Sequence, residues 1–125
     1  MESQGNNNVP WVPVTRRRRF PRYHADLPLR VRDPLERNLD GRCEVLSEGG
    51  LGGTVAESLA VGGVVQLQFR VPTHPALFEV WAIVRDHGGF HHGFEFVFLT
   101  DSEREAIRRF CTGLTIQSEV GRVDL

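Results

Sequence analysis

A run of arginines near the start of the chain offers the most chemistry. Arg16–Arg19 are consecutive, and Arg22 follows three residues later. The planar guanidinium of arginine binds a phosphate, or the N7 and O6 edge of guanine, through two parallel hydrogen bonds. Residues 1–32 hold seven arginines against two acids, whereas the remainder holds eight arginines against fourteen acids. A basic segment on an acidic body predicts an anionic partner for that segment.

A serine followed by a glycine cluster forms the second candidate group. Ser47 carries a hydroxyl that both donates and accepts hydrogen bonds. The glycines at 49, 50, 52 and 53 predict a tight turn with positive φ, and Gly50 would allow close approach of the backbone to a ligand. The chain contains no lysine, so the cluster is not a phosphate loop. No G-x-S-x-G elbow surrounds Ser47, so we expect a binding protein and not an enzyme.

The histidines and cysteines do not predict a metal centre. His87, His91 and His92 flank one turn, but no cysteine or carboxylate joins them at a zinc-binding spacing, so a polar hairpin is the better interpretation. Cys43 and Cys111 lie far apart and match no ligand motif. Two reduced packing cysteines are typical of a cytoplasmic protein. We therefore expect no metal and no cofactor.

Short strands must position these groups. Apolar residues alternate with polar ones along several segments that end at proline or glycine, and this period of two is typical of half-buried strands. The glycine cluster is expected to lead into a short strand near Thr54, and residues 86–89 are expected to form a turn. Phe94, Phe96 and Phe98 are expected to be core residues. The predicted strands cover residues 27–32, 42–46, 64–71, 78–84 and 94–98.

The pattern becomes helical after the last strand. Thr100 and Glu103 have the spacing of a capping box, and Gly113 is a natural stop. One amphipathic helix after a series of strands predicts an all-β barrel with a helix across one opening. No run of about 18 apolar residues predicts membrane insertion, and the N-terminus does not resemble a secretory signal. The apolar stripe of the helix consists of Ala106, Ile107, Phe110, Cys111 and Leu114.

Three segments together resemble the PilZ domain family. Arg18-Arg19-Phe20-Pro21-Arg22 matches its RxxxR motif, and Ser47-Glu48-Gly49-Gly50-Leu51 matches the latter part of its [D/N]xSxxG motif. Gly93-Phe94-Glu95-Phe96 is similar to the strand that precedes its last helix. The resemblance covers residues 15–114, with a flexible N-terminal tail at 1–14 and a C-terminal tail at 115–125. It implies a six-stranded antiparallel barrel that binds cyclic di-GMP on its outer surface.

The resemblance also implies which residues hold the ligand. Arg18 and Arg22 would be the principal ligands and Arg19 would assist, while Ser47 and Gly50 would meet the ligand from the barrel surface. The four consecutive arginines lie in the N-terminal segment that carries the RxxxR motif, which we call the arm. These arginines repel one another, so we expect the free arm to be disordered and to become ordered on binding. A downstream protein partner would detect that change.

One position departs from the family motif. Val45 stands where the motif has Asp or Asn, and Glu44 should point to the opposite face of the strand. Loss of one charged hydrogen bond to guanine costs about 1.5–3 kcal/mol. A degenerate PilZ-like adaptor that binds a protein but not cyclic di-GMP is therefore an alternative. A small nucleic-acid-binding barrel is a third reading, although the acidic chain after Arg32 argues against specific nucleic-acid binding.

Overall fold

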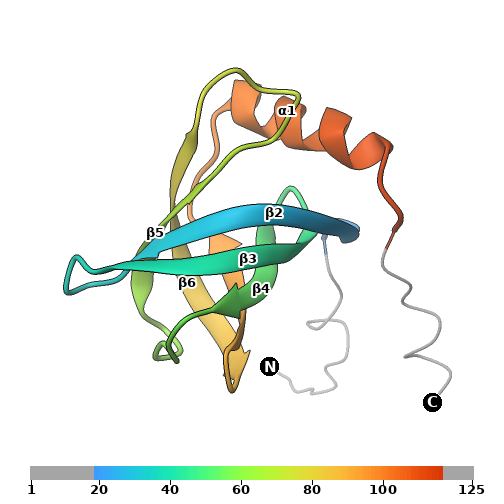
Figure 1. Cartoon of the computed structure of the whole chain (residues 1–125). Helices are drawn as coiled ribbons and strands as arrows, with labels where there is room; N and C mark the ends of the chain where they lie inside the picture. Colours follow the sequence, from blue (N-terminus) through green and yellow to red (C-terminus); the bar gives the residue numbers. More distant parts are fainter. Residues whose placement is uncertain (1–18, 117–125) are drawn as a thin grey trace, which may run out of the picture.

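Six antiparallel strands close on themselves within residues 19–116, the part of the chain that the computed structural model describes (Figure 1). Around the barrel the order is β2-β3-β4-β7-β6-β5, and the pairing of β2 with β5 closes the ring. The predicted all-β barrel is confirmed. The strands are β2 (Tyr23–Arg32), β3 (Asn38–Leu46), β4 (Gly50–Val55), β5 (Val64–Phe69), β6 (Phe78–Gly88) and β7 (His91–Phe96).

The alternation of side chains along the strands explains why the sheet closes. On β5, Val65, Leu67 and Phe69 are buried and face the inside, and each pairs with an inward-facing residue of β6. Phe69 stacks on Phe78 with ring centroids 4.9 Å apart. An open sheet would leave this apolar face in water, whereas a closed barrel buries it and leaves no sheet edge.

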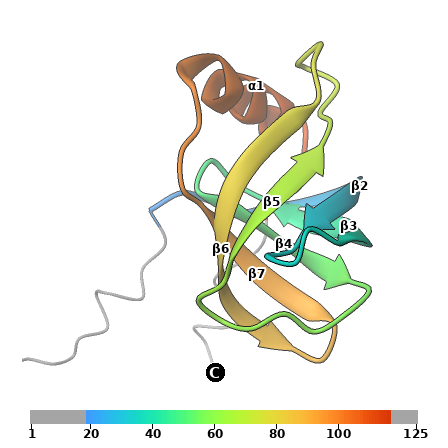
Figure 2. The same ribbon diagram turned by 90° about the vertical axis from the view of Figure 1, so that its left-hand side faces the viewer.

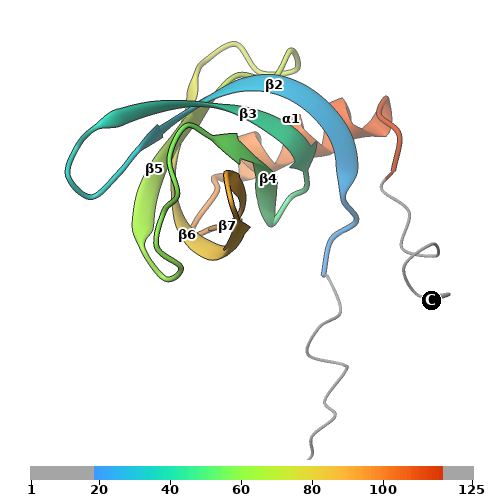
Figure 3. The ribbon, with the colours of Figure 1, turned by 60° about the horizontal axis from the view of Figure 1, so that its bottom comes forward.

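The helix α1 (Asp101–Thr112) lies across one end of the barrel (Figures 1 and 2). The predicted capping box is present, because Thr100 Oγ1 accepts from Glu103 N at 3.1 Å and Glu103 Oε1 accepts from Thr100 N at 2.9 Å. Ile107 is completely buried over the barrel core. Seen from the opposite end, the helix lies behind the ring of strands (Figure 3). Its apolar face therefore closes the opening.

Gly49 lies in a turn, but Gly50, Gly52 and Gly53 already belong to the strand that follows it, so the positive φ predicted for this cluster is wrong. β4 begins at Gly50, and the glycines with positive φ among the described residues are Gly62 and Gly89. The cause is crowding between strands. A Cβ on Gly50 would lie 2.0 Å from the carbonyl oxygen of Phe94, and a Cβ on Gly53 would lie 1.8 Å from that of Arg42.

Two further predictions near the last strand are corrected. Phe98 is 71% exposed, whereas Phe94 and Phe96 are buried as expected. Strand β7 ends at Phe96, so the alternation stops there and Leu99 is the next residue to enter the core. The predicted turn at 86–89 also lies too early, because β6 continues to Gly88.

The predicted tail at 1–14 lies outside the described residues, as does most of the predicted tail at 115–125. The two described residues of the latter pair with the start of β2: His24 N donates to Thr115 O at 2.8 Å, and Ile116 forms a bridge with Tyr23. Between residues 19 and 116, no helix has the length and apolar character needed to cross a membrane.

Candidate functional site

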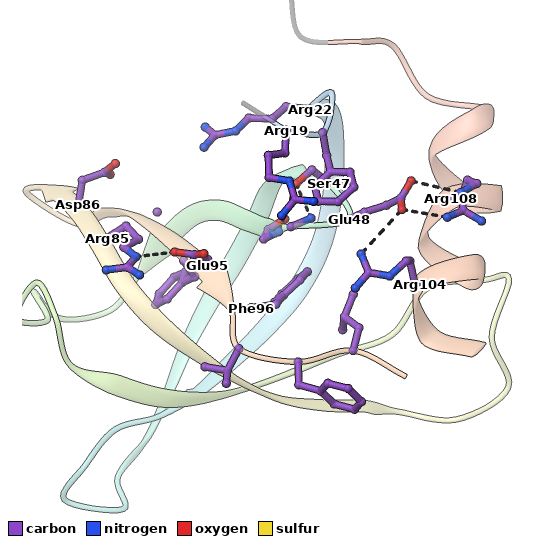
Figure 4. Close-up of a pocket in the computed structure, with 18 residues that line it drawn as sticks. Arg19, Arg22, Ser47, Glu48, Arg85, Asp86, Glu95, Phe96, Arg104 and Arg108 are labelled. Atoms are coloured by element: carbon purple, nitrogen blue, oxygen red, sulfur yellow. Dashed lines mark hydrogen bonds and ion pairs between the residues drawn. The ribbon is translucent and has the colours of Figure 1, made fainter. Parts of the chain in front are cut away.

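A cavity of about 650 Å³ lies on the outer surface of the barrel, beside α1 (Figure 4). Its size is in the range of small-ligand pockets. Arginines outnumber carboxylates in its lining, so an anion would be attracted to it. Among the described residues, the charged side chains that line it are Arg19, Arg22, Glu48, Arg85, Asp86, Glu95, Arg104 and Arg108.

The arm that carries the first motif packs against the barrel through Phe20. The guanidinium carbon of Arg19 lies 5.5 Å from the centre of the Phe20 ring, and that of Arg104 lies 5.7 Å from it. A Cβ on Gly49 would lie 3.0 Å from Phe20 Cδ2, so the ring rests on a glycine surface. Cation–π contacts of this kind contribute about 0.5–1 kcal/mol each at exposed sites. Phe20 thus holds Arg19 beside the second motif.

The Ser47–Gly50 turn is organised by the serine hydroxyl. Ser47 Oγ accepts from Gly49 N at 3.0 Å and from Gly50 N at 3.2 Å, and it lies 3.3 Å from Gly50 O, to which it donates. The backbone closes the same turn, because Ser47 N donates to Gly50 O at 2.9 Å. Ser47 is buried. The serine therefore shapes the floor of the cavity.

Glu48 connects this turn to α1. Its carboxylate accepts two hydrogen bonds from Arg108, at 3.0 and 3.2 Å, while Arg104 lies 3.9 Å away. The hydrogen bonds to Glu48 raise the pKa of Arg108. A two-bond arginine–carboxylate contact has fixed geometry. The helix and the turn therefore meet at the same wall of the cavity (Figure 4). Arg104 of this helix also contacts the Phe20 ring.

The opposite wall comes from β6 and β7. Arg85 Nε donates to Glu95 Oε1 at 2.5 Å across the two strands. Next to this pair, the register between β6 and β7 shifts between Val84 and Asp86. The carboxylate of Asp86 lies over Gly93, where a Cβ would come within 2.9 Å of Asp86 Oδ1. Glycine at position 93 makes room for that carboxylate.

Most of the predicted site residues lie together. Arg19, Arg22, Ser47 and Gly50 all line the one cavity, whereas Arg18 falls outside the described residues. Their contact with a ligand stays a prediction. Sequence reasoning missed several other lining residues. Phe20, Glu48, Gly49, Gly93 and Glu95 stood inside the quoted motifs but were not named as site residues. Arg85, Asp86, Arg104 and Arg108 lie outside those motifs and gave no signal in the sequence.

The expectation for Glu44 is corrected by a bulge. Cys43 pairs with Gly53 and Val45 pairs with Gly52, so Glu44 is the extra residue of β3 and has no partner on β4. Glu44 and Val45 follow each other between the buried residues Cys43 and Leu46, and neither is buried. Glu44 Oε1 lies 3.6 Å from His91 Nδ1. Glu44 therefore faces outward like Val45, and neither residue lines the cavity.

The histidine hairpin contains one structural residue. His92 is 3% exposed, its Nε2 accepts from Leu59 N at 2.9 Å, and its Nδ1 lies 2.8 Å from Phe90 O. These contacts require a neutral ring with the proton on Nδ1. Burial lowers the pKa of His92, partly opposed by the hydrogen bond to Phe90. Within residues 19–116, no group of three potential metal ligands occurs.

Both cysteines are free and buried. Burial raises the pKa of Cys43 to about 12 and that of Cys111 to about 11. Such thiols are poor nucleophiles at neutral pH. Cys43 and Cys111 are therefore packing residues, as the sequence predicted.

The fold agrees with comparison to known families. The profile of the PilZ domain matches residues 16–113, and the chain therefore belongs to the PilZ domain family. PilZ domains are binding domains, and some have been solved with c-di-GMP bound. No curated protein matches the chain significantly.

Solved PilZ structures share this fold at low sequence identity. The PilZ domain of YcgR from Escherichia coli, solved with c-di-GMP, has a TM-score of 0.66 and 17% identity over 78% of this chain and 91% of its own. The Bacillus subtilis inhibitor of motility MotI/DgrA has a TM-score of 0.67 and 21% identity over 77% of this chain. This chain spans only 50% of MotI/DgrA. The PilZ domain of CeSA from a cellulose-synthesizing bacterium has a TM-score of 0.57 and 18% identity, over 74% of this chain and 95% of its own.

Proposed function

We propose that this protein is a receptor for cyclic di-GMP, which it binds in the cavity beside α1. The observation that supports this most directly is the convergence of two separate motifs. Arg19 and Arg22 of the arm, and Ser47 and Gly50 of the turn, line the same cavity although they are more than twenty residues apart. A ligand with two phosphates and two guanines suits arginine forks, which bind both groups through paired hydrogen bonds.

The charge of the cavity supports an anionic ligand. Glu48 is occupied by Arg108 and Glu95 by Arg85, so two of the acids are already paired. Binding of the dianion would add arginines from the arm, including Arg18, to this surface. The same proposal places the protein in the cytoplasm, in keeping with its two free thiols.

We propose further that binding orders the arm and that a partner protein detects the change. Trypsin cleaves after arginine, so limited proteolysis at residues 16–19 follows the arm directly. Cyclic di-GMP should slow cleavage there several-fold and leave cleavage elsewhere unchanged. Equal cleavage rates with and without the ligand contradict this part of the proposal.

Calorimetric titration with cyclic di-GMP tests the receptor function. We expect saturable binding, weakened about ten- to hundred-fold in Arg22→Ala, because one charged hydrogen-bonding group is removed. Arg70→Ala is a matched control, since Arg70 is exposed and does not line this cavity. An Arg22→Ala variant that binds as tightly as the wild type contradicts the receptor model.

A ligand-free adaptor is the second candidate, and two observations favour it. Val45 stands where the family motif has Asp or Asn. In addition, Trp81 and Val97 are more than half exposed on the outer face of the barrel and lie side by side, because Val97 N donates to Trp81 O at 2.9 Å. Exposed apolar neighbours are typical of protein-binding surfaces.

Two experiments separate the alternatives. Absence of heat at high micromolar cyclic di-GMP would favour the adaptor, and retention on nucleic acid at physiological salt would favour a nucleic-acid-binding barrel.

A further inference from the structure

Four residues form one row across the outer face of the barrel. Val45 on β3 pairs with Gly52 on β4, Gly52 pairs with Gly93 on β7, and Gly93 pairs with Asp86 on β6. Two glycines therefore separate the valine at one end from the aspartate at the other. Because neither glycine has a side chain, the sheet surface between Val45 and Asp86 is bare backbone.

The carboxylate of Asp86 leans along this row. It covers Gly93, where a Cβ would lie 2.9 Å from Oδ1 and 3.2 Å from Oδ2. Asp86 also lines the same cavity as Arg19 and Arg22. The side chain is thus held over the sheet surface, facing the site that the arm covers.

Asp86 differs from the other acids of the cavity in having unused acceptors. Glu95 accepts from Arg85, and Glu48 accepts from Arg108. No hydrogen bond or ion pair engages the Asp86 carboxylate within residues 19–116, although Arg85 is its neighbour in sequence. An exposed carboxylate in an arginine-rich cavity with both oxygens available is suited to a neutral donor group of a ligand.

Guanine presents such donors on its Watson–Crick edge, where N1–H and the exocyclic amine lie side by side. A carboxylate accepts from both at once, with charge assistance. Val45 cannot supply this contact. We infer that Asp86 receives the Watson–Crick edge of one guanine and so determines the preference for guanine over other bases. This inference rests on the proposed function.

Asp86 does not occupy the place of the missing motif acid. Strands lie about 4.8 Å apart, so three strand spacings place the two ends of the row about 14 Å from each other. The carboxylate at 86 therefore meets a different part of the ligand from the part an acid at 45 would meet. A ligand with two guanines offers two such edges.

The test is a double-mutant cycle in which one change removes the Asp86 carboxylate and the other removes the exocyclic amine of the ligand. Wild type, Asp86→Asn and the control Glu79→Gln are titrated with cyclic di-GMP and with cyclic di-IMP, which lacks the exocyclic amine. Glu79 is an exposed acid on the same strand, outside this cavity. We expect Asp86→Asn to bind cyclic di-GMP about ten- to hundred-fold more weakly, and Glu79→Gln to bind as the wild type does. For cyclic di-IMP, the loss of affinity caused by Asp86→Asn should be markedly smaller. The substitution and the missing exocyclic amine each remove the same contact, so their effects do not add.

The outcomes separate this inference from the proposed function. If the wild type binds cyclic di-GMP and Arg22→Ala weakens it, but Asp86→Asn binds equally or more tightly, the receptor function stands and the role of Asp86 is wrong. Equal losses for both ligands also overturn the guanine contact. If the wild type binds neither ligand, both proposals fall. Thermal unfolding of Asp86→Asn that matches the wild type shows that any loss of affinity comes from the contact.

Discussion

The ring of Phe20 lies against the bare backbone of Gly49, so the arm of the first motif touches the turn of the second. Arg19 and Arg104 place their guanidinium groups at the same ring. The two motifs therefore lie on one side of the barrel, as a shared ligand requires.

Replacement of Phe20 by alanine should weaken cyclic di-GMP binding about twofold to fivefold. The variant loses the contact that holds Arg19 near the cavity, and cation–π contacts are each worth about 0.5–1 kcal/mol. Calorimetry measures the change. Phe90→Ala is the matched control, because Phe90 is exposed in the β6–β7 turn and does not line the cavity. Equal affinities for Phe20→Ala and Phe90→Ala contradict a role for the ring.

Gly50→Ala should destabilise the fold by about 3 kcal/mol or more, because its Cβ would overlap the carbonyl oxygen of Phe94. Urea unfolding provides the free energy. Gly88→Ala is the control: it lies near the end of β6, and a Cβ there meets nothing within 4 Å. The control should change stability by less than about 0.5 kcal/mol. Similar values for the two variants would show that β4 can move away from β7 at little cost.

Restoring the acid of the family motif should strengthen binding. Val45→Asp places a carboxylate on the outer face of β3 and is expected to tighten cyclic di-GMP binding about tenfold. Val64→Asp adds the same charge at an exposed position of β5 and serves as the control. If Val45→Asp binds no more tightly than Val64→Asp, the motif acid makes no contact in this protein.

Acid should destabilise the protein through His92. Burial lowers its pKa in the folded state, whereas the unfolded chain has the ordinary value of about 6.5. Between these two pKa values the folded state binds fewer protons than the unfolded chain. The contribution of neutral His92 to the free energy of unfolding is therefore complete above about pH 6.5, and it is lost as the pH falls toward the pKa of His92 in the folded state. The slope reaches at most about 1.4 kcal/mol per pH unit.

Urea unfolding at pH 7.5 and 5.5 measures this loss. His92→Gln keeps an acceptor for Leu59 N but cannot titrate, so its stability should change less between the two pH values. His87→Gln, at an exposed neighbour, should retain the pH dependence of the wild type. A His92→Gln variant with the same pH dependence as the wild type would assign the effect to another group.

The barrel and its helix could be predicted because their signals are local. Alternation along β5 and the capping box of Thr100 and Glu103 each occupy a few residues. The role of Gly50 could not be predicted in the same way, since the atom that requires glycine is the carbonyl of Phe94, far along the chain. Alternation alone also does not show where β7 ends, which is why Phe98 was placed in the core.

The site was predictable to the extent that it consists of contiguous motifs. The arm and the Ser47 turn are each visible as short segments. The ion pair of Glu48 with Arg108 joins residues sixty positions apart, and the row from Val45 to Asp86 depends on the pairing of four strands. Such relationships arise from the register of the barrel, which includes bulges in β3 and β6 that no single segment reveals.

The central claim, that arm and turn bind one ligand together, is tested most directly by amide NMR spectra during titration with cyclic di-GMP. We predict that the signals of Phe20 and Arg22 in the arm, and of Gly49 and Gly50 in the turn, shift with the same saturation curve. Signals of Gly62 and Gly63, which precede β5 and lie outside the cavity, should not move. Shifts confined to the arm, or no shifts at saturating ligand, would contradict the claim.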